Sequence, residues 1–329
     1  MEVEKVSQAK FKRGAKYIGN AVTILSVIYI AISVGRMDID INRLPNKEKV
    51  LIWSALGIVI TIISLFLLSY SWMQPLQWLG NKKINFLNIS SIYLKSNIGK
   101  YLPGNVAHYV ERNLFAMNIG IRQVYIAISS GLECIIIVVT AIGISVLFSY
   151  KELVRVFDSF GILKWIKIGL AAGVVLFVVL SIIFLHIPKV KNILKDIRST
   201  ATIKSGFGVL IKMIVCDAIM LYGNGICFSI ICWSISGTVI DAKQFMYFIN
   251  CYILAWVVGY CIPGAPGGIG VRELVIILLV QNTVNSDLVV LTALIHRIVT
   301  ILGDLSGYGI SIGIKTYLRK KNFKKDCFI

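Results

Sequence analysis

Charged residues are scarce in this chain, and acidic residues are the scarcest. Of its 329 residues only 15% are charged, with 16 Asp and Glu against 34 Lys and Arg, whereas 57% are hydrophobic. No polar stretch is long enough to bury a core of its own, which argues against separate soluble domains. A mean hydropathy of +0.80 places the chain among integral membrane proteins, and we expect one polytopic domain over residues 1–329.

Motifs for nucleotide hydrolysis and metal binding are also missing. No G-x-x-x-x-G-K-[ST] loop occurs, because Gly99 and Lys100 lack the upstream glycine and the following hydroxyl residue. There is no H-E-x-x-H, and the seven cysteines include no C-x-x-C pair, so we expect no cofactor and no metal. The net charge of +18 comes mostly from short segments beside apolar runs, which is typical of membrane orientation rather than of nucleic-acid binding.

Prolines are few, and three of the six lie in two Pro-Gly breaks. The first break is 101–105 (YLPGN), and the second is 262–270 (IPGAPGGIG). Backbone without helical hydrogen bonds is not tolerated against lipid, so it must be buried in protein or line a watery cavity. Broken segments in both halves of a chain point to a transporter's binding site. We therefore expect the two breaks to meet on one polar cavity inside the membrane.

Eight apolar runs can be drawn, and most reach the ~20 residues needed to cross the hydrocarbon core. They cover residues 18–35, 50–71, 124–149, 166–187, 207–236, 244–262, 270–284 and 288–313. The seventh belongs to a broken segment at 263–284; it is short, as a half-helix would be, and we expect it to cross rather than re-enter. Glycines four residues apart predict close helix packing in lipid, at Gly169/Gly173, Gly303/Gly307 and Gly309/Gly313.

The distribution of basic residues predicts the orientation of these runs. With the N-terminus inside, 22 Lys and Arg residues fall on the cytoplasmic side, including the tail at 314–329, and nine fall outside. This asymmetry favours a cell-membrane protein with both termini in the cytoplasm and an even number of crossings. A version with seven spans would place the Lys-rich tail outside, which the rule disfavours.

The segment between the second and third runs is too long and too apolar for a plain loop. Two short helical stretches within 84–121 flank the first break, and neither could span the membrane alone. We predict a re-entrant helical hairpin that enters from the cytoplasmic side. The alternative is a pair of surface helices anchored at the interface by Trp72, Trp78 and Tyr93. The fold class is thus an all-α membrane protein with about eight transmembrane helices, a re-entrant hairpin and two broken segments.

Four charged residues lie inside the predicted spans, where charge is costly. They are Glu133, Asp217, Arg297 and Asp304. One interpretation is a set of internal ion pairs, for example Glu133 or Asp304 with Arg297. The other is contact with a charged headgroup or proton coupling. For Asp217, near the cytoplasmic end of its run, the structural interpretation is favoured.

Basic and aromatic residues beside the first break suit a phosphate group. Lys100, His108 and Arg112 could bind it through charge-assisted hydrogen bonds, with the arginine as a bidentate fork. A half-helix beginning at Gly104 would direct its free N–H groups at the same anion. The alternative is that Lys100 and Arg112 only extend to the interface. Residues His186 and His296 are interpreted as structural.

These stretches resemble a known family. Residues 99–109 (GKYLPGNVAHY), followed by Arg112, are similar to the GKYLPG-x-V-x-x-Y element of the lysylphosphatidylglycerol synthase transmembrane family, and 266–273 (PGGIGVRE) resemble its P-G-G-x-G-x-R-E element. Glu133 and Arg297 match the acidic residue and last-span arginine of that family. The predicted substrate-binding residues are Lys100, Tyr101, Pro103, Gly104, Asn105, His108, Arg112, Glu133, Gly267, Gly268, Gly270, Arg272, Glu273 and Arg297.

The resemblance implies a flippase-like function. Family members of full architecture join this membrane domain to a soluble transferase that loads lysine from lysyl-tRNA onto phosphatidylglycerol. This chain ends sixteen residues after its last run, so we expect no such domain in it. The expected function is translocation of a polar membrane lipid, either aminoacylated, such as lysyl-phosphatidylglycerol, or glycan-linked. The alternative is a phosphatidylglycerol lysyltransferase that works with a partner catalytic domain; the expected partner is a separate aminoacyl-phospholipid transferase or a glycosyltransferase.

Overall fold

The computed structural model describes residues 46–102, 107–159, 203–236, 241–261, 268, 271–280 and 286–326, and these residues form helices without strands. The all-α fold class is confirmed. In chain order the elements are α2 (Lys47–Gly80), α3 (Phe86–Ser96), the 3-10 helix η2 (Asn97–Tyr101), α4 (Ala107–Met117), α5 (Gln123–Ser159), α8 (Ile203–Ser236), α9 (Ala242–Cys261), α10 (Val271–Val280) and α11 (Ser286–Asp326).

Within these ranges five helices are long and apolar enough to cross a membrane, and they correspond to predicted runs two, three, five, six and eight. Runs 18–35 and 166–187 lie outside the described residues, so a count of eight stays a prediction. In place of the seventh run the structure has α10, whose ten residues reach ~15 Å, half of the hydrocarbon thickness. Whether this segment crosses depends on residues beyond Val280, so its crossing also stays a prediction.

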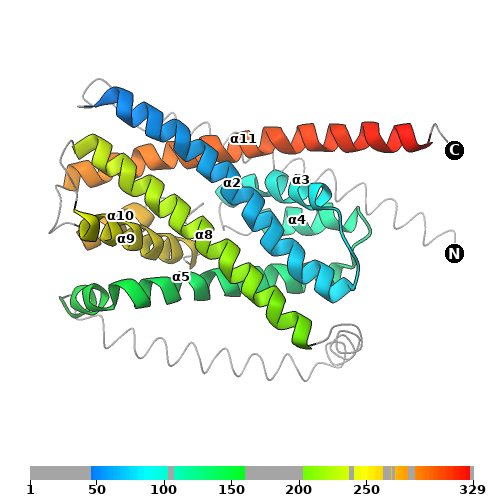
Figure 1. Cartoon of the computed structure of the whole chain (residues 1–329), viewed down its shortest axis with the longest axis horizontal. Coiled ribbons are helices and arrows are strands. Elements are labelled where there is room, and N and C mark those ends of the chain that lie inside the picture. The colour runs from blue at the N-terminus through cyan, green and yellow to red at the C-terminus, as the bar shows by residue number, and fades with distance from the viewer. Residues whose placement is uncertain are drawn as a thin grey trace.

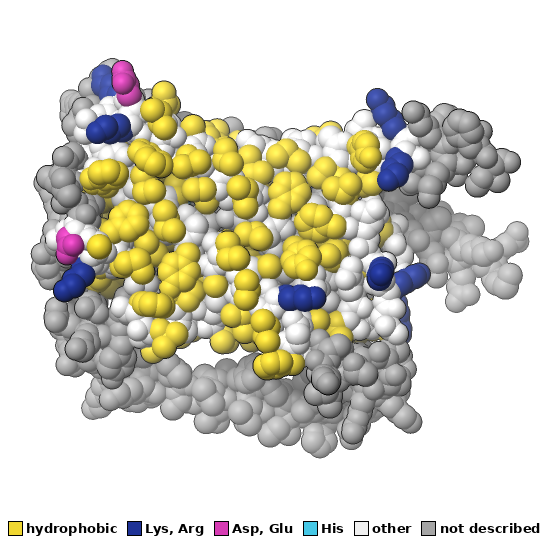
Figure 2. Space-filling view, in the orientation of Figure 1, with side chains coloured by type: hydrophobic (Ala, Val, Ile, Leu, Met, Phe, Trp, Pro, Cys, Tyr) yellow, Lys and Arg dark blue, Asp and Glu magenta, His cyan; other side chains and the backbone are white. Residues whose placement is uncertain are grey.

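An apolar belt covers the middle of the molecule. Figure 1 shows α5 and α11 running along its long dimension, and α2 and α8 crossing between them diagonally. In Figure 2 hydrophobic side chains cover the middle of the visible face, and most charged side chains lie toward the left and right ends of that face. Exposed apolar residues such as Leu51, Val139 and Ile219 contribute to this surface. Side chains that would be costly to expose to water are stable against lipid tails, which identifies the belt as the lipid-facing surface.

The segment predicted as a hairpin is helical and packs inside the bundle. Helix α3 contacts α2 and α11, and α4 contacts α3 and α5 (Figure 1). Ile89, Leu94 and Ile98 are completely buried. The surface-helix alternative is wrong for two of its three anchors, because Trp72 is 0% and Tyr93 is 3% exposed. Entry from the cytoplasmic side stays a prediction.

Three helices extend well beyond the ends of their predicted runs, and one of them is α5, which continues from residue 149 to Ser159. Helix α2 continues through Pro75 to Gly80 and stops where Asn81 adopts a left-handed conformation with φ of 43°. Helix α11 continues to Asp326, so most of the basic tail is helical. Lysine and arginine have good helix propensity, so the helix persists after hydrophobicity ends. Hydropathy marks the part of a helix that lies in lipid and not the ends of the helix.

Glycines on α11 set its distance from α2. A Cβ built on Gly303 would lie 2.5 Å from the Thr61 Cβ, and one on Gly307 would lie 2.6 Å from the Leu65 Cδ1. The packing role predicted for this pair is confirmed. No described atom lies within 4 Å of a Cβ built on Gly309 or Gly313, so close packing at that pair stays a prediction. The pair at 169 and 173 lies outside the described residues.

We expect Gly303→Ala to lower the free energy of unfolding by about 1–3 kcal/mol, because the added methyl group overlaps the branched carbon of Thr61. Gly309→Ala is the matched control in the same helix. It adds the methyl group where no described atom lies within 4 Å and should be neutral or slightly stabilising. Thermal unfolding of both variants in one detergent measures the difference. Equal midpoints would show that the contact between α2 and α11 adapts at no cost.

Candidate functional site

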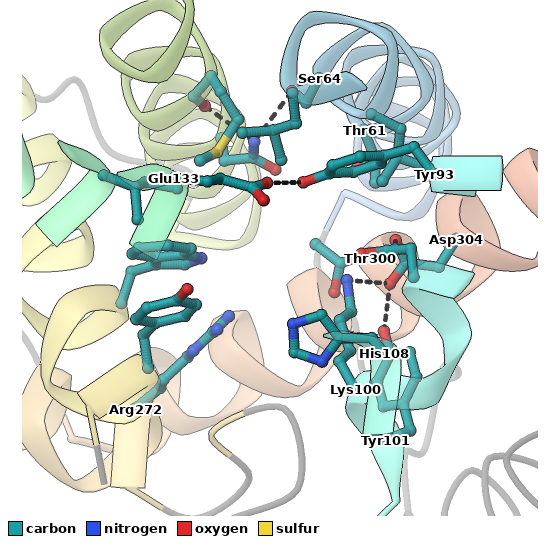
Figure 3. A pocket seen from close by; sticks show the side chains of 18 of the residues that line it. Thr61, Ser64, Tyr93, Lys100, Tyr101, His108, Glu133, Arg272, Thr300 and Asp304 are labelled. Carbon is teal, nitrogen blue, oxygen red and sulfur yellow. Dashed lines mark hydrogen bonds and ion pairs between the residues drawn. The ribbon is translucent and has the colours of Figure 1, made fainter. Parts of the chain in front are cut away.

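A polar cavity of about 110 Å³ lies among the helices, and every described helix contributes to its lining (Figure 3). Charged side chains inside a membrane face the bundle interior, where they pair with one another or mark a path for a polar ligand. The charged residues that line this cavity are Lys100, Arg112, Glu133, Arg272, Arg297 and Asp304.

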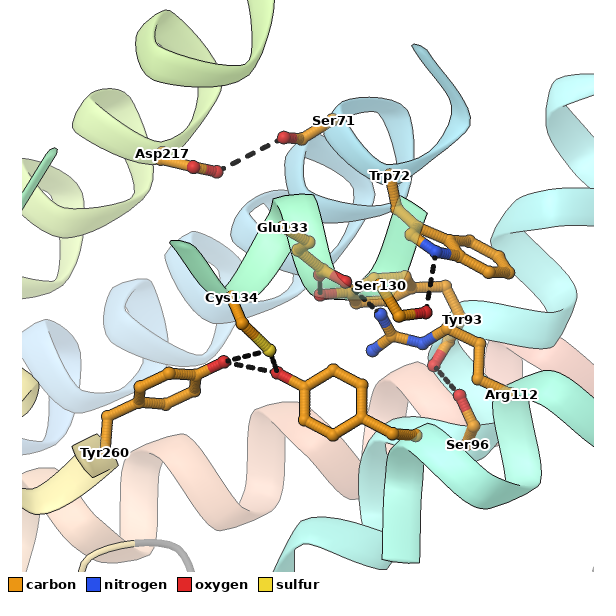
Figure 4. A network of polar contacts seen from close by, with 11 residues as sticks. Ser71, Trp72, Tyr93, Ser96, Arg112, Ser130, Glu133, Cys134, Asp217 and Tyr260 are labelled. Atoms are coloured by element: carbon orange, nitrogen blue, oxygen red, sulfur yellow. Dashed lines mark hydrogen bonds and ion pairs between the residues drawn. The ribbon is translucent and has the colours of Figure 1, made fainter. Parts of the chain in front are cut away.

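The first charged cluster joins α4 to α5. The Arg112 guanidinium pairs with Glu133 Oε2, while the Tyr93 hydroxyl donates to Glu133 Oε1 at 2.5 Å (Figure 4). The guanidinium also lies 3.8 Å from the Tyr93 ring centre and 5.1 Å from that of Trp72. Arg112 is 1% and Glu133 is 3% exposed. A buried pair of this kind persists because each charge is neutralised and hydrogen-bonded.

The second charged cluster joins η2 to α11. Asp304 Oδ1 accepts from Asn97 Nδ2 at 2.8 Å, and Oδ2 accepts from the Tyr101 hydroxyl at 2.5 Å. Lys100 Nζ lies 2.7 Å from the same Oδ2 (Figure 3). Three donors of one short helix therefore converge on one buried carboxylate.

These clusters bear on the ion pairs that the sequence left open. Lys100 pairs with Asp304, and Arg112 pairs with Glu133, so the hairpin supplies a cation to each carboxylate. The suggested pairing of Arg297 with Glu133 or Asp304 stays a prediction. Arg297 lies beside the Tyr101 ring, with 5.7 Å between the guanidinium carbon and the ring centre.

The second break places Arg272 at the cavity. Its guanidinium carbon lies 5.5 Å from the Trp256 ring centre. Gly268 has a φ of +76°, and a Cβ built on it or on Gly259 would lie 2.6 Å from the Arg272 side chain. Both glycines therefore leave the space that this side chain occupies. Among the described residues Arg272 has no ion-pair partner, and its buried Nε has no hydrogen bond.

Close approach at the first break also depends on a glycine. A Cβ built on Gly99 would lie 2.8 Å from the backbone nitrogen of His108. The two arms of the hairpin can therefore come together only where this side chain is absent. His108 follows at the start of α4, lines the cavity and lies against Tyr109 in a tilted arrangement with 3.9 Å between ring centres.

The residues that flank the two breaks meet as predicted. Among the predicted site residues, those that line the cavity are Lys100, Tyr101, His108, Arg112, Glu133, Arg272 and Arg297. Glu273 instead lines a small adjoining pocket of about 20 Å³, which Arg272 and Arg297 share. Pro103, Gly104, Asn105, Gly267 and Gly270 lie outside the described residues. Convergence on one cavity is therefore confirmed for the flanking residues.

The sequence did not predict some of the residues that line the cavity. Asp304 stood out as an intramembrane charge but was not assigned to the site. The aromatic residues Tyr252, Trp256 and Tyr260 of α9 line the cavity, although nothing in the sequence separates them from the other aromatic residues of the spans. Tyr260 also shares a hydrogen bond with Tyr109, and Cys134 donates to the Tyr109 hydroxyl at 2.9 Å (Figure 4).

Two further features lie away from the cavity. Asp217 accepts from the Ser71 hydroxyl at 3.3 Å between α8 and α2 and does not line the cavity.

Residues 309–313 match the hydrolase pattern G-x-S-x-G, but they lie within continuous α11. Ser311 there donates to the Tyr308 carbonyl at 2.6 Å. The pattern functions as a nucleophile only on a strand-to-helix turn, so it carries no catalytic meaning here.

Comparison with known proteins supports the motif resemblance. The family model described as "Lysylphosphatidylglycerol synthase TM region" matches residues 19–305, which is most of the chain. A comparison with curated proteins gives no match. The matched range contains the hairpin, both breaks and every charged residue that lines the cavity. The chain therefore belongs to the lysylphosphatidylglycerol synthase transmembrane family.

Proposed function

We propose that this protein is a translocase that moves the polar headgroup of a membrane phospholipid between leaflets through the central cavity. A membrane function related to lipids follows from the family. The observation that carries the finer proposal is Arg272, whose side chain is half-buried and faces the cavity, with a buried Nε and no ion-pair partner among the described residues. A buried cation in a membrane needs an anion, and a lipid phosphate supplies one.

The arrangement supports translocation in two further ways. The cavity lies among helices that are long enough to cross the membrane, so a headgroup inside it is shielded from the tails. Both interrupted segments flank it, and such segments can change conformation with less loss of hydrogen bonds than continuous helices. The alternative function, lysyl transfer with a partner catalytic domain, rests on the family description alone.

Translocation can be measured with the purified protein in vesicles that contain phosphatidylglycerol with a fluorescent acyl chain. A quencher added outside reports the labelled lipid that reaches the outer leaflet. We expect Arg272→Gln to slow this exchange about ten-fold or more, because a charge-assisted contact contributes roughly 1.5–3 kcal/mol. Lys320→Gln, an exposed position on α11, removes one cation outside the cavity and should leave the rate unchanged.

The same experiment separates the alternatives. Wild-type vesicles that exchange lipid no faster than protein-free vesicles would refute translocation. Exchange that is normal in Arg272→Gln would mean that the lipid does not pass this cavity. Formation of lysyl-phosphatidylglycerol only when a transferase partner and lysyl-tRNA are added, without exchange, would favour the enzymatic alternative.

A further inference from the structure

The charges of the cavity indicate which headgroup it accepts. We infer that the transported lipid has a net negative headgroup: a phosphate ester whose remaining polar part is a glycerol or sugar without an amine. The inference rests on the proposed function and specifies its substrate class. It excludes an aminoacylated headgroup as the preferred cargo.

Neither carboxylate in the cavity is available to an ammonium group. Glu133 already accepts the Tyr93 hydroxyl on one oxygen and pairs with Arg112 on the other. Asp304 accepts from η2 on both oxygens and pairs with Lys100. A lysyl headgroup would have to displace one of these cations, and displacement leaves a buried charge without a partner.

Aromatic ring faces are the second kind of ammonium site, and the rings of Trp256 and Tyr101 already have cations of the protein beside them. The Arg272 guanidinium carbon lies 5.5 Å from the Trp256 ring centre. Trp256 also stacks on Tyr260, with 5.0 Å between ring centres. The Tyr101 ring has Lys100 Nζ at 5.3 Å and the Arg297 guanidinium carbon at 5.7 Å. At both rings, the position that an ammonium group of the ligand would take is therefore already close to a cation of the protein.

Positive charge is in excess in the same space. The cavity lining contains four cationic side chains and two carboxylates, namely Lys100, Arg112, Arg272 and Arg297 with Glu133 and Asp304. The adjoining pocket adds Glu273, and one positive charge still remains over the two spaces. Arg272 has no carboxylate within ion-pair distance among the described side chains. An anionic phosphate suits this excess, and a planar guanidinium can bind two of its oxygens at once.

The neutral polar groups of the lining suit hydroxyls. Asn224 lies along the cavity and donates from Nδ2 to the Ser64 hydroxyl at 3.1 Å and the Met220 carbonyl at 2.9 Å, so its amide can still accept through Oδ1. The Tyr252 hydroxyl also lies along the cavity and can donate or accept. Glycerol and sugars present hydroxyl groups that bind to such side chains without adding charge. The favoured headgroup therefore combines an anionic phosphate with an uncharged, hydroxylated remainder.

The test compares two tracers in vesicles containing the wild-type protein. Both tracers carry the same fluorescent acyl chain: one is phosphatidylglycerol, and the other is lysyl-phosphatidylglycerol, which differs only by the cationic lysyl ester. We expect phosphatidylglycerol to exchange at least ten-fold faster. Equal rates, or faster exchange of the lysyl form, would overturn the inference while leaving translocation itself intact. If neither tracer exceeds the rate in protein-free vesicles, the proposed function fails.

A variant tests whether the cavity charge is the cause. Arg272→Gln should slow phosphatidylglycerol exchange and spare the slow exchange of the lysyl form, so that their ratio falls about ten-fold. Lys320→Gln should keep the wild-type ratio. A ratio that stays at the wild-type value in Arg272→Gln, with both rates lowered equally, would show that this arginine does not select the headgroup. Size-exclusion profiles of all variants establish that each is folded.

Discussion

Arg112→Ala is expected to lower the free energy of unfolding by about 3–5 kcal/mol, the largest effect of any single replacement in α4. The change leaves the Glu133 carboxylate buried at 3% exposure without its cation, and removing one partner of a buried pair has this cost. It also removes the group that packs on the rings of Trp72 and Tyr93. Denaturant or thermal unfolding of the purified protein in detergent measures the loss.

Two further variants make this result interpretable. Arg122→Ala removes an exposed arginine from the turn before α5 and should change stability by less than about 1 kcal/mol. The double variant Arg112→Leu with Glu133→Leu removes both buried charges and should recover much of the loss. If Arg112→Ala is no less stable than Arg122→Ala, the pair with Glu133 does not hold the hairpin in place.

Asp304→Ala should have an effect of similar size and loosen the hairpin. Lys100, Tyr101 and Asn97 would all lose their shared acceptor, and two of these groups are buried. We expect a loss of roughly 3–5 kcal/mol and faster amide hydrogen exchange in η2. Hydrogen exchange followed by mass spectrometry locates the change in the sequence.

The conservative variant Asp304→Asn distinguishes charge from hydrogen bonding. Its amide oxygen can still accept from η2, but it carries no charge for Lys100. We expect it to lose less stability than the alanine variant and still to exchange faster than the wild type at η2. Wild-type hydrogen exchange in Asp304→Ala would contradict the conclusion that this carboxylate fixes η2 against α11.

The sequence alone predicted the features that depend on local composition. The apolar runs that became α2, α5, α8, α9 and α11 follow from partition between water and lipid, which is a property of each segment by itself. The Pro-Gly breaks were equally visible, because proline removes a hydrogen-bond donor wherever it occurs. Interrupted backbone in a membrane protein must find a polar environment, and this predicted that the two breaks converge.

The partners of the charged residues could not be predicted in this way. Arg112 and Glu133 are 21 residues apart, and Tyr101 and Asp304 are 203 apart. Helix periodicity relates only residues of the same helix, and it placed Arg297 and Asp304, two turns apart, on one face. Close packing at Gly99 and the burial of α3 bring the hairpin cations to these carboxylates.

Membrane character, helical class and the location of the two breaks were thus determined by the sequence, because each depends on the chemistry of a short segment. The tertiary structure decided which charges neutralise one another and which cation has no carboxylate partner among the described residues. That outcome depends on the packing of hairpin, spans and second break around one cavity, where a shift of a few ångströms changes which atoms meet. Arg112 and Arg272 are both arginines beside a break, and only their three-dimensional surroundings give the first a carboxylate and leave the second facing the cavity.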